Sequence, residues 1–395
     1  MDADELELLL RQDSSASAAG PAATGITLRQ RWQDAMHFRP VDRLPNFEFG
    51  YWAQTLQAWH AQGLPPEIDN EAKAYAWFGI ENWATIPLDV MGLRPAFVHE
   101  VIDDDGVIRT YRDATGTVAR INIQGDQSIP QYLSFPVSDR ASWEAFRHRV
   151  QPTRDRLHPD WPQIAARLRA GDAPVAVPIG SMIGLPRNWI GFENIALMVY
   201  DDPVLLEEIV ETCCQMVCTC LEWVLLDLPV DFGFGWEDIC FNSGPIVGVE
   251  VMQHVVAPRY RRITDLLARH GCDISWVDCD GDVTSIVEAM RSGGLTCLFP
   301  VEVHGGSDPV ALRRAHPDLR LQGGVCKMRL AHSCAAIDAE MQRLLPVVRE
   351  GGFLPGVDHR VPADVPLVNY QHYLKVKRDL FGVGGEPQYD ERAVP

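Results

Sequence analysis

Short apolar runs alternate with longer amphipathic stretches along most of this chain. The apolar runs lie at residues 44–50, 84–90 (the weakest), 173–180, 230–235, 272–278, 295–301, 319–324 and 352–357. Between several of them, apolar positions recur every three or four residues, as in 203–227, 257–270, 282–292 and 335–350. Buried strands that alternate with helices at this spacing predict right-handed βαβ units and a parallel sheet. The pattern therefore predicts an α/β fold, a (β/α)8 TIM barrel.

Two segments depart from this alternation. Residues 96–123 contain FVHEV, VIRTYR and TVARINI, separated by DDDG and DATG turns. This pattern predicts an antiparallel hairpin inserted near the N-terminal part of the barrel. Small residues dominate SSASAAGPAATG at 14–25, which predicts a flexible segment at 1–26 ahead of one barrel domain at 27–395. A doubly wound open sheet is the competing arrangement, but no GxGxxG motif follows the first strand.

Composition and charge narrow the classes of function. The chain has 395 residues, of which 46% are hydrophobic, so it can bury a large core. Its formal net charge of −19 argues against a nucleic-acid partner, which needs clustered Lys and Arg. No apolar run approaches the roughly 20 residues of a membrane span, and MDADELELLLRQD lacks the basic flank of a signal peptide. We therefore expect a cytoplasmic protein with no membrane partner and with reduced cysteines.

Ionisable side chains gather where the predicted strands end. ISWVDCDGD, PVEVHGG and FLPGVDHRVP each carry an apolar run into acids or histidines. In a parallel barrel, the carboxyl ends of the strands meet at one face and form the active site. Each acid alone has a structural explanation as a helix cap, and Asp282 and Asp308 fit that role. Charged groups that converge at one face repel each other unless a metal, a cation or a substrate compensates, which favours an enzyme.

The motifs also resemble those of a known family. RPVDRLPNFEFGYW, FGWEDICFNSGPIVG, VDCDGDV, FPVEVHGGSDPVALRR, LQGGVCK and GGFLPGVDHRVPADVPLVNY resemble the uroporphyrinogen decarboxylase superfamily, in its methyltransferase-like branch. The resemblance covers residues 27–382 and implies a (β/α)8 barrel and a homodimer. True decarboxylases carry arginines in an N-terminal segment that bind the substrate acetates. This chain has RLPNFEFGYWAQT instead, which argues against porphyrinogen decarboxylation.

The resemblance also implies a metal site. Corrinoid-linked methyltransferases and cobalamin-independent methionine synthase bind zinc through a His-x-Cys pattern, a Cys after the last strand and, in the synthase, a Glu after the intervening strand. The matching positions here are Asp278, Asp280, Glu302 and His359. This oxygen-rich set is less specific for zinc than a thiolate set and also admits manganese, iron or magnesium. Two alternatives stay open: a register that uses Cys279 as the thiolate, and a metal-free acid/base cluster.

The leading function is methyl transfer from a small O-methyl or N-methyl donor. The resemblance implies a corrinoid acceptor, and no corrinoid-binding DxHxxG segment is visible, so a separate corrinoid protein is expected. The candidate catalytic residues are Glu237, Asp238, His304 and Lys327. The candidate substrate-binding residues are Glu48, Tyr51, Trp52, Trp236, Asn242 and Cys326.

Two other functions compete with methyl transfer. One is a cofactor-independent decarboxylase or other lyase that acts on a small carboxylic acid through a protonated carboxyl group. Its activity would survive chelation and need no corrinoid. The other is a non-catalytic barrel that binds a small cationic ligand through the acids.

Overall fold

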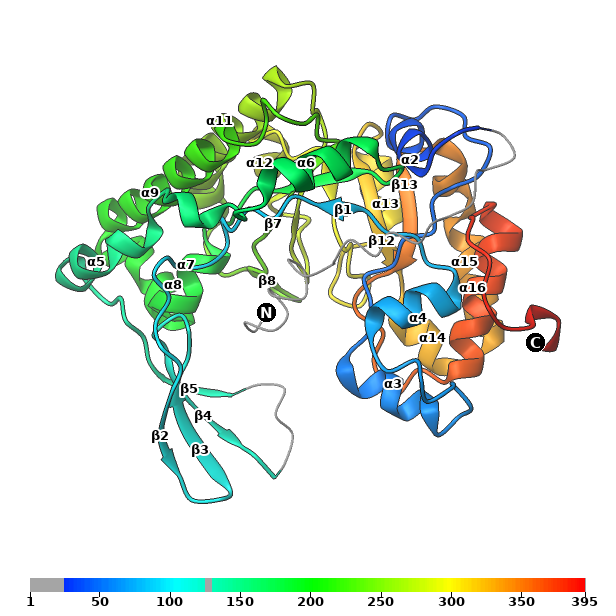
Figure 1. Cartoon of the computed structure of the whole chain (residues 1–395), viewed down its shortest axis with the longest axis horizontal. Helices are drawn as coiled ribbons and strands as arrows, with labels where there is room; N and C mark the ends of the chain where they lie inside the picture. Colours follow the sequence, from blue (N-terminus) through cyan, green and yellow to red (C-terminus); the bar gives the residue numbers. More distant parts are fainter. Residues whose placement is uncertain (1–24, 125–129, 395) are drawn as a thin grey trace.

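The computed structural model describes residues 25–124 and 130–394 and shows a mixed α/β fold with two parallel sheets (Figure 1). The first sheet has the order β1-β6-β7-β10, and its strands are Ala84–Thr85, Val175–Pro178, Phe232–Trp236 and Ser275–Asp278. The second has the order β11-β12-β13, and its strands are Cys297–Leu298, Arg320–Val325 and Phe353–Val357. Every one of these strands coincides with a predicted apolar run. The α/β class with parallel strands is therefore confirmed.

One closed eight-stranded sheet is not found in the described part of the chain. A single bridge, between Asp278 and Phe299, joins the two sheets. Residues 45–50 lie extended but form no strand, although Glu81 N–H donates to Asn46 O at 2.8 Å. In a continuous sheet, Val357 N–H would donate to a backbone carbonyl of the neighbouring strand. Here it donates to the Glu48 carboxylate instead, at 2.9 Å. The predicted first strand is thus a segment outside both sheets that is held by backbone and side-chain hydrogen bonds.

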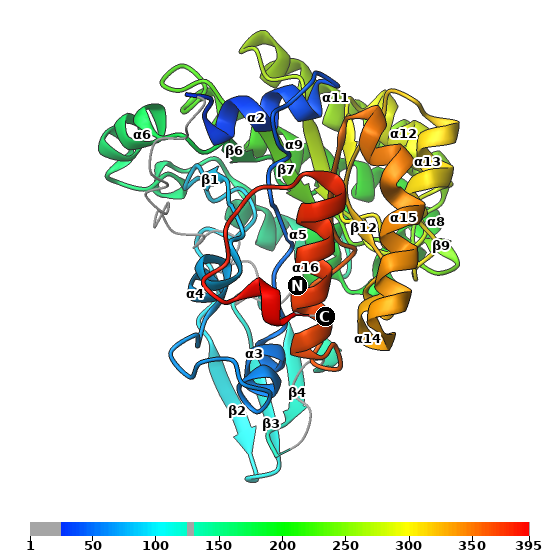
Figure 2. The ribbon, with the colours of Figure 1, turned by 90° about the vertical axis from the view of Figure 1, so that its right-hand side faces the viewer.

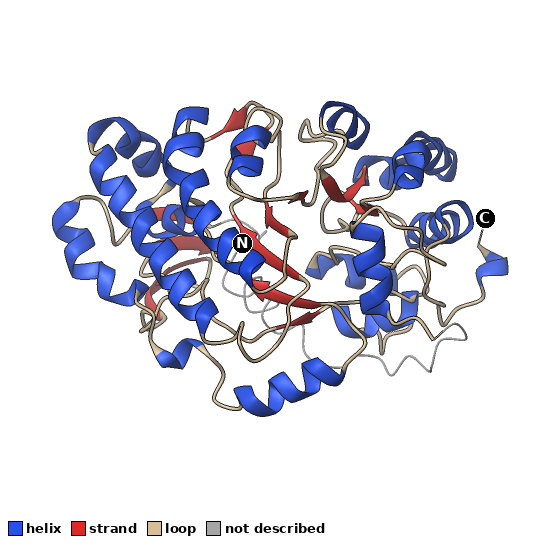
Figure 3. Ribbon diagram, turned by 90° about the horizontal axis from the view of Figure 1, so that it is seen from above, coloured by secondary structure: helices blue, strands red, loops and turns tan. Residues whose placement is uncertain are grey.

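Helices surround the parallel strands (Figure 3). They begin where the sequence supplies caps: Asp202 accepts a bond from Leu205 N–H ahead of α9, and Asp308 accepts one from Ala311 N–H ahead of α13. Asp282 instead bonds Thr284, and α12 begins only at Val287. The longer helices are α2 (Leu28–Met36), α3 (Ala53–His60), α4 (Glu71–Phe78), α6 (Trp161–Ala170), α8 (Phe192–Asp201), α9 (Pro203–Glu222), α11 (Ala257–Arg269), α15 (Cys334–Glu350) and α16 (Leu367–Phe381). The shorter ones include α5 (Arg140–Phe146), α7 (Gly184–Ile190), α12 (Val287–Ser292), α13 (Pro309–Ala315) and α14 (Lys327–His332).

An antiparallel sheet projects from the rest of the molecule (Figure 1). Its strands follow the order β2-β3-β4-β5, at Glu100–Asp104, Ile108–Arg112, Val118–Asn122 and Gln131–Ser134. The predicted hairpin at 96–123 corresponds to the first three strands. The fourth lies beyond the predicted boundary, because QYLS is too short to show a clear alternation.

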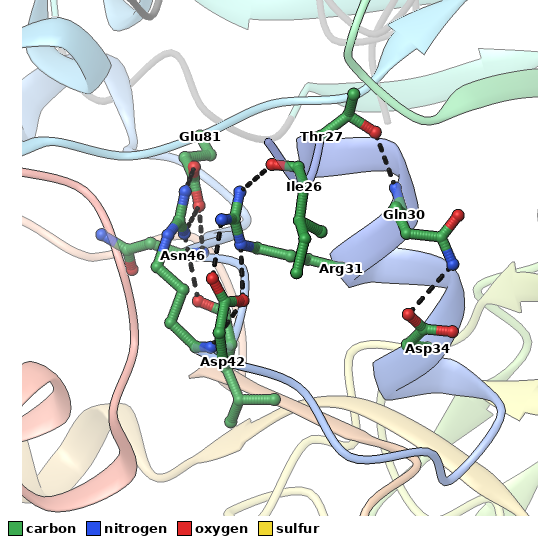
Figure 4. Close-up of polar contacts among 10 residues, drawn as sticks. Ile26, Thr27, Gln30, Arg31, Asp34, Asp42, Asn46 and Glu81 are labelled. Atoms are coloured by element: carbon green, nitrogen blue, oxygen red, sulfur yellow. Dashed lines mark hydrogen bonds and ion pairs between the residues drawn. The ribbon is translucent and has the colours of Figure 1, made fainter. Parts of the chain in front are cut away.

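The start of the described chain is fixed by polar contacts around α2 (Figure 4). Thr27 caps the helix by accepting a bond from Gln30 N–H at 3.1 Å. Arg31 binds both carboxylate oxygens of Asp42, at 2.7 and 2.8 Å, and also donates to Ile26 O. These contacts anchor the helix that begins at Leu28. The flexible segment predicted at 1–26 lies almost entirely outside the described residues.

Aromatic rings from both parallel sheets meet in the interior. Trp276 of β10 contacts Phe234 of β7 and Trp83, with ring centroids 5.6 and 6.3 Å apart. Trp276 also contacts Phe299, beyond β11, at 4.6 Å. Phe299 in turn contacts Phe49 at 4.6 Å. These rings make the space between the strands apolar. The charged groups described below lie at the strand ends or against the helices.

A buried ion pair ties the segment at 45–50 to α16, which runs beside α15 (Figure 2). The Lys377 ammonium lies 2.6 Å from the Glu48 carboxylate, and both side chains have no exposed surface. Tyr373 O–H donates to the same carboxylate oxygen at 2.6 Å. Lys377 also donates to Asn46 Oδ1 at 3.0 Å. The charges are therefore paired and hydrogen-bonded, which buried charges require.

Removing one partner of this pair is expected to destabilise the fold, because the other charge stays buried without a counter-charge. We expect Glu48→Gln or Lys377→Met to lower the free energy of unfolding by about 3–5 kcal/mol, measured by urea denaturation. The exposed pair Lys73–Asp69 supplies the control, and Lys73→Met is expected to leave stability nearly unchanged. Equal effects at the two sites would contradict a structural role for the buried pair.

Candidate active site at the strand ends

The loops that follow neighbouring parallel strands begin at the same height along the sheet. In the register of the first sheet, Asp278 lies opposite Trp236. Glu237 N–H then donates to Asp278 O at 2.8 Å, and Cys279 N–H donates to Phe299 O at 3.1 Å. The loops after β7, β10 and β11 therefore begin side by side, as the parallel pattern predicts.

Asp280 and His359 form the centre of the candidate site. His359 Nε2 lies 3.0 Å from Asp280 Oδ2. Trp52 stacks on the imidazole with ring centroids 5.5 Å apart, and Phe49 meets it edge-on at 5.3 Å. The second oxygen, Asp280 Oδ1, is buried and has no hydrogen-bond partner in the described structure. The pair thus has a fixed orientation and one carboxylate oxygen whose hydrogen-bonding capacity is unused in the described structure.

Asp238 lies beside this pair. Its carboxylate is 3.1 Å from the Arg187 guanidinium, which also lies over the Trp236 ring at 5.2 Å. Burial raises the pKa of Asp238 above its ordinary value; Arg187 opposes this shift, and the charge of Asp280 adds to it. Asp238 also has a positive φ of 45°, which is uncommon outside glycine and is tolerated better by Asp than by most residues. The two acids therefore act on each other electrostatically.

A second polar network joins the loops after β11, β12 and β13. Lys327 Nζ lies 2.5 Å from Glu302 Oε1, and Gly281 N–H donates to Glu302 Oε2 at 2.9 Å. Asp358 is fully buried and accepts bonds from the backbone N–H groups of Lys327 and Val303, both at 2.9 Å. Burial raises the pKa of Asp358 to about 6. This network fixes the loops relative to one another.

Glu237 lies beneath the site and has all its carboxylate bonds filled. It accepts from the N–H groups of Met182 at 2.6 Å, Ile183 at 2.9 Å and Gly184 at 2.8 Å, and from Tyr260 O–H. Burial raises the pKa of Glu237. A carboxylate in this setting holds the start of α7, the helix from which Arg187 reaches the site.

The other predicted site residues have other partners, are buried, or are exposed to solvent. The Glu48 carboxylate is enclosed by Lys377 and Tyr373, and Tyr51 O–H bonds Tyr370 O–H at 3.0 Å. Cys326 is buried, and burial raises its pKa. Asn242, in the turn between β8 (Cys240–Phe241) and β9 (Gly244–Pro245), is exposed, as is His304.

The side chains predicted to bind a metal do not form a four-ligand centre. Across residues 25–124 and 130–394, no group of three or more His, Cys, Asp or Glu side chains is placed to hold a metal ion. Asp280 and His359 bond each other, whereas Glu302 is already paired with the Lys327 ammonium. The residues present therefore do not fit the expected metal set in this arrangement.

Three residues complete the site beyond the candidate set. Asp358 stands next to His359 in the strand-end motif, and Phe49 lies within the NFEFG run, so both positions were visible as strand-end residues. Arg187 lies nine residues beyond the end of β6, and no local pattern indicates that it reaches Asp238.

The fold and the site together define a parallel-stranded α/β protein with a polar site at the carboxyl ends of its strands. No family model matches the chain, and no curated protein matches it in sequence. Among solved structures, it is similar to a methyltransferase from Methanosarcina mazei, with a TM-score of 0.61 and 15% identity. That similarity covers 90% of this chain and 99% of the other. At this identity, the likeness shows a shared fold. In the described residues, no helix is both long enough and apolar enough to cross a membrane.

The titration of Asp358 is expected to make stability depend on pH. Its pKa rises from 3.8 to about 6 in the folded protein, so the folded state holds this proton more tightly than the unfolded state does. The resulting stabilisation, about 3 kcal/mol, is present below about pH 4 and is lost as the pH rises through about 6. Asp358→Asn is expected to remove this loss, measured by urea unfolding across that range.

The exposed Asp265→Asn serves as the control for this titration and is expected to keep the wild-type pH dependence. A stability difference between wild type and Asp358→Asn that stays constant with pH would show that Asp358 does not titrate in this way.

Proposed function

We propose that this chain is a methyltransferase of the uroporphyrinogen decarboxylase-like type, which takes a methyl group from a small methylated donor at the strand ends. The observation that carries the proposal is the Asp280–His359 pair, which lies beside Trp52 and has an unpartnered carboxylate oxygen. The pair lies at the end of the strands where barrels of this class place their active sites. The fold shared with a methyltransferase supports the proposal.

The barrel itself is part of this proposal. Residues 45–50 lie between the two parallel sheets: Glu81 N–H, near β1, donates to Asn46 O at 2.8 Å, and Val361 N–H, beyond β13, donates to Gly50 O at 2.9 Å. The bridge between Asp278 and Phe299 connects the sheets on the other side. These contacts support a ring of strands in which side chains replace part of the backbone ladder.

Methyl transfer breaks the bond between the methyl carbon and its donor atom, and the electron pair stays on the donor atom. A neutral donor then needs a proton at that atom. Because Asp280 holds Nε2 of His359, Nδ1 is the ring atom that can hold or release this proton. Asp280 stabilises the imidazolium that supplies it. Arg187 and Glu237 position the neighbouring loop and take no part in the bond changes.

The proposed acceptor is a corrinoid on a separate protein, which supplies the nucleophile when it docks. We also propose that the chain forms a homodimer and acts in the cytoplasm. No step is assigned to a metal, because Lys327 already neutralises one of the expected ligands.

A lyase acting on a small carboxylic acid is the second candidate. It is favoured by Arg187, a guanidinium at the strand ends that is suited to a carboxylate. It ranks lower because Asp238 already pairs with this guanidinium, so a substrate carboxylate would have to displace it.

Asp280→Asn and His359→Gln are expected to lower methyl transfer on the order of 10²–10⁴-fold, because either change removes the proton-holding pair. The measurement is methylcobalamin formation from cob(I)alamin with a panel of O-methyl, N-methyl and S-methyl donors. The free energy of unfolding should change little, because both side chains lie in loops.

The matched control is His316→Gln, whose ring pairs with Glu288 at 3.1 Å near the opposite ends of the strands. This variant is expected to keep wild-type turnover. Wild-type rates in the Asp280 and His359 variants would show that the site is misplaced. Decarboxylation without any methyl acceptor would favour the lyase.

A further inference from the structure

The acids at the described strand ends differ in the charged partners that they contact. Asp238 is paired with Arg187, and Glu302 is paired with Lys327. Asp280 has only His359, which carries a charge only when it is protonated. Asp280 thus pairs with an imidazole instead of a permanently charged side chain, and its Oδ1 atom is buried without a donor in the described structure. A buried acceptor of this kind is costly until a ligand supplies a donor or a positive charge.

Aromatic surface lies directly beside this charge. Trp52 is half-buried and stacks on His359, the partner of Asp280. Phe49 lies below the same imidazole, although Arg360 already lies over the Phe49 ring at 5.7 Å. Trp52 is thus the ring that remains for a ligand. An indole beside a carboxylate attracts organic cations, because the ring face and the acid both favour positive charge while the ring also receives methyl groups.

We infer that this site selects methyl donors that carry a positive charge, a quaternary ammonium or a sulfonium, with the charge beside Asp280 and the methyl groups against Trp52. The inference rests on the proposed methyl transfer and narrows its substrate class. A neutral ether would leave Asp280 Oδ1 without a partner. A small organic cation leaves both existing ion pairs in place.

The chemistry of such donors suits this arrangement. The carbon–nitrogen or carbon–sulfur bond breaks, and both electrons stay on the donor atom, which leaves as a neutral amine or sulfide. The electron pair of the acceptor forms the new bond to the methyl carbon. The leaving atom needs no proton, so for these donors His359 is a positioning residue that orients Asp280.

Binding of an unreactive pair of probes tests the inference without any acceptor. The full chain is titrated by calorimetry with choline and with its neutral carbon isostere, 3,3-dimethyl-1-butanol, in buffer of constant ionic strength. We expect choline to bind at least about tenfold more tightly. Asp280→Asn should remove this preference, and Trp52→Leu should weaken choline binding by roughly fivefold.

Two control variants separate this site from the general attraction of an acidic protein for cations. Asp265→Asn removes an exposed acid, and Tyr200→Leu removes an aromatic ring that is 82% exposed. Both are expected to leave choline affinity unchanged. Equal affinity for choline and its isostere, or choline binding that survives Asp280→Asn, would overturn the inference.

The same assays separate failure of the inference from failure of the proposed function. If a neutral O-methyl donor is turned over and choline does not bind, the cationic class is wrong and methyl transfer stands. If choline binds in an Asp280-dependent way and no methylated compound is turned over, methyl transfer is wrong and the cation site stands.

Discussion

The apolar column of rings between the two parallel sheets is the constraint on which the rest of the structure depends. Trp276 contacts rings from the strands on both sides, and Phe299 carries the contact to Phe49. A packed aromatic interior has no place for an unpaired charge, because its desolvation is not repaid there. Ionisable groups therefore lie at the strand ends, where Phe49 meets the imidazole of His359 edge-on, or in pairs against the helices, as Glu48 and Lys377 do.

Charges that do enter the structure are satisfied and serve to position loops. Glu237 takes three backbone N–H groups and holds the start of α7, and Asp358 takes two and joins the loops after β11 and β12. Glu237 thereby holds the helix that carries Arg187, and Asp358 holds the loop that carries Lys327. Precision of this kind is what a reacting pair needs from its surroundings. The acids that looked most catalytic by burial are thus the ones that support the site.

The sequence predicted seven parallel strands and the long helices, because periodicity and caps are local signals. The sequence could not show which side chains of NFEFG face the interior and which face the helices. Both faces are buried, so the alternation of apolar and polar residues does not tell them apart. Phe49 faces Phe299 in the interior, so Glu48, one residue earlier, faces Lys377 on α16. The ion pair of Lys327 could not be predicted either. The sequence places Lys327 at a strand end, but its contact with Glu302 depends on how two loops far apart in sequence meet.

The ion pair between Lys327 and Glu302 bears on whether a metal ion or an organic cation could bind at the strand ends. A divalent metal bound by the expected set would have to displace the ammonium from Glu302 and the imidazole from Asp280. Each displacement breaks an existing ion pair, so the bound metal would have to compensate for both lost contacts. The proposed singly charged organic group beside Asp280 would break neither pair and would lie near the Trp52 indole, which stacks on His359. The pairs already formed by Glu302 and Asp280 therefore weigh against a metal held by the expected set, whereas the proposed organic cation would leave both pairs in place.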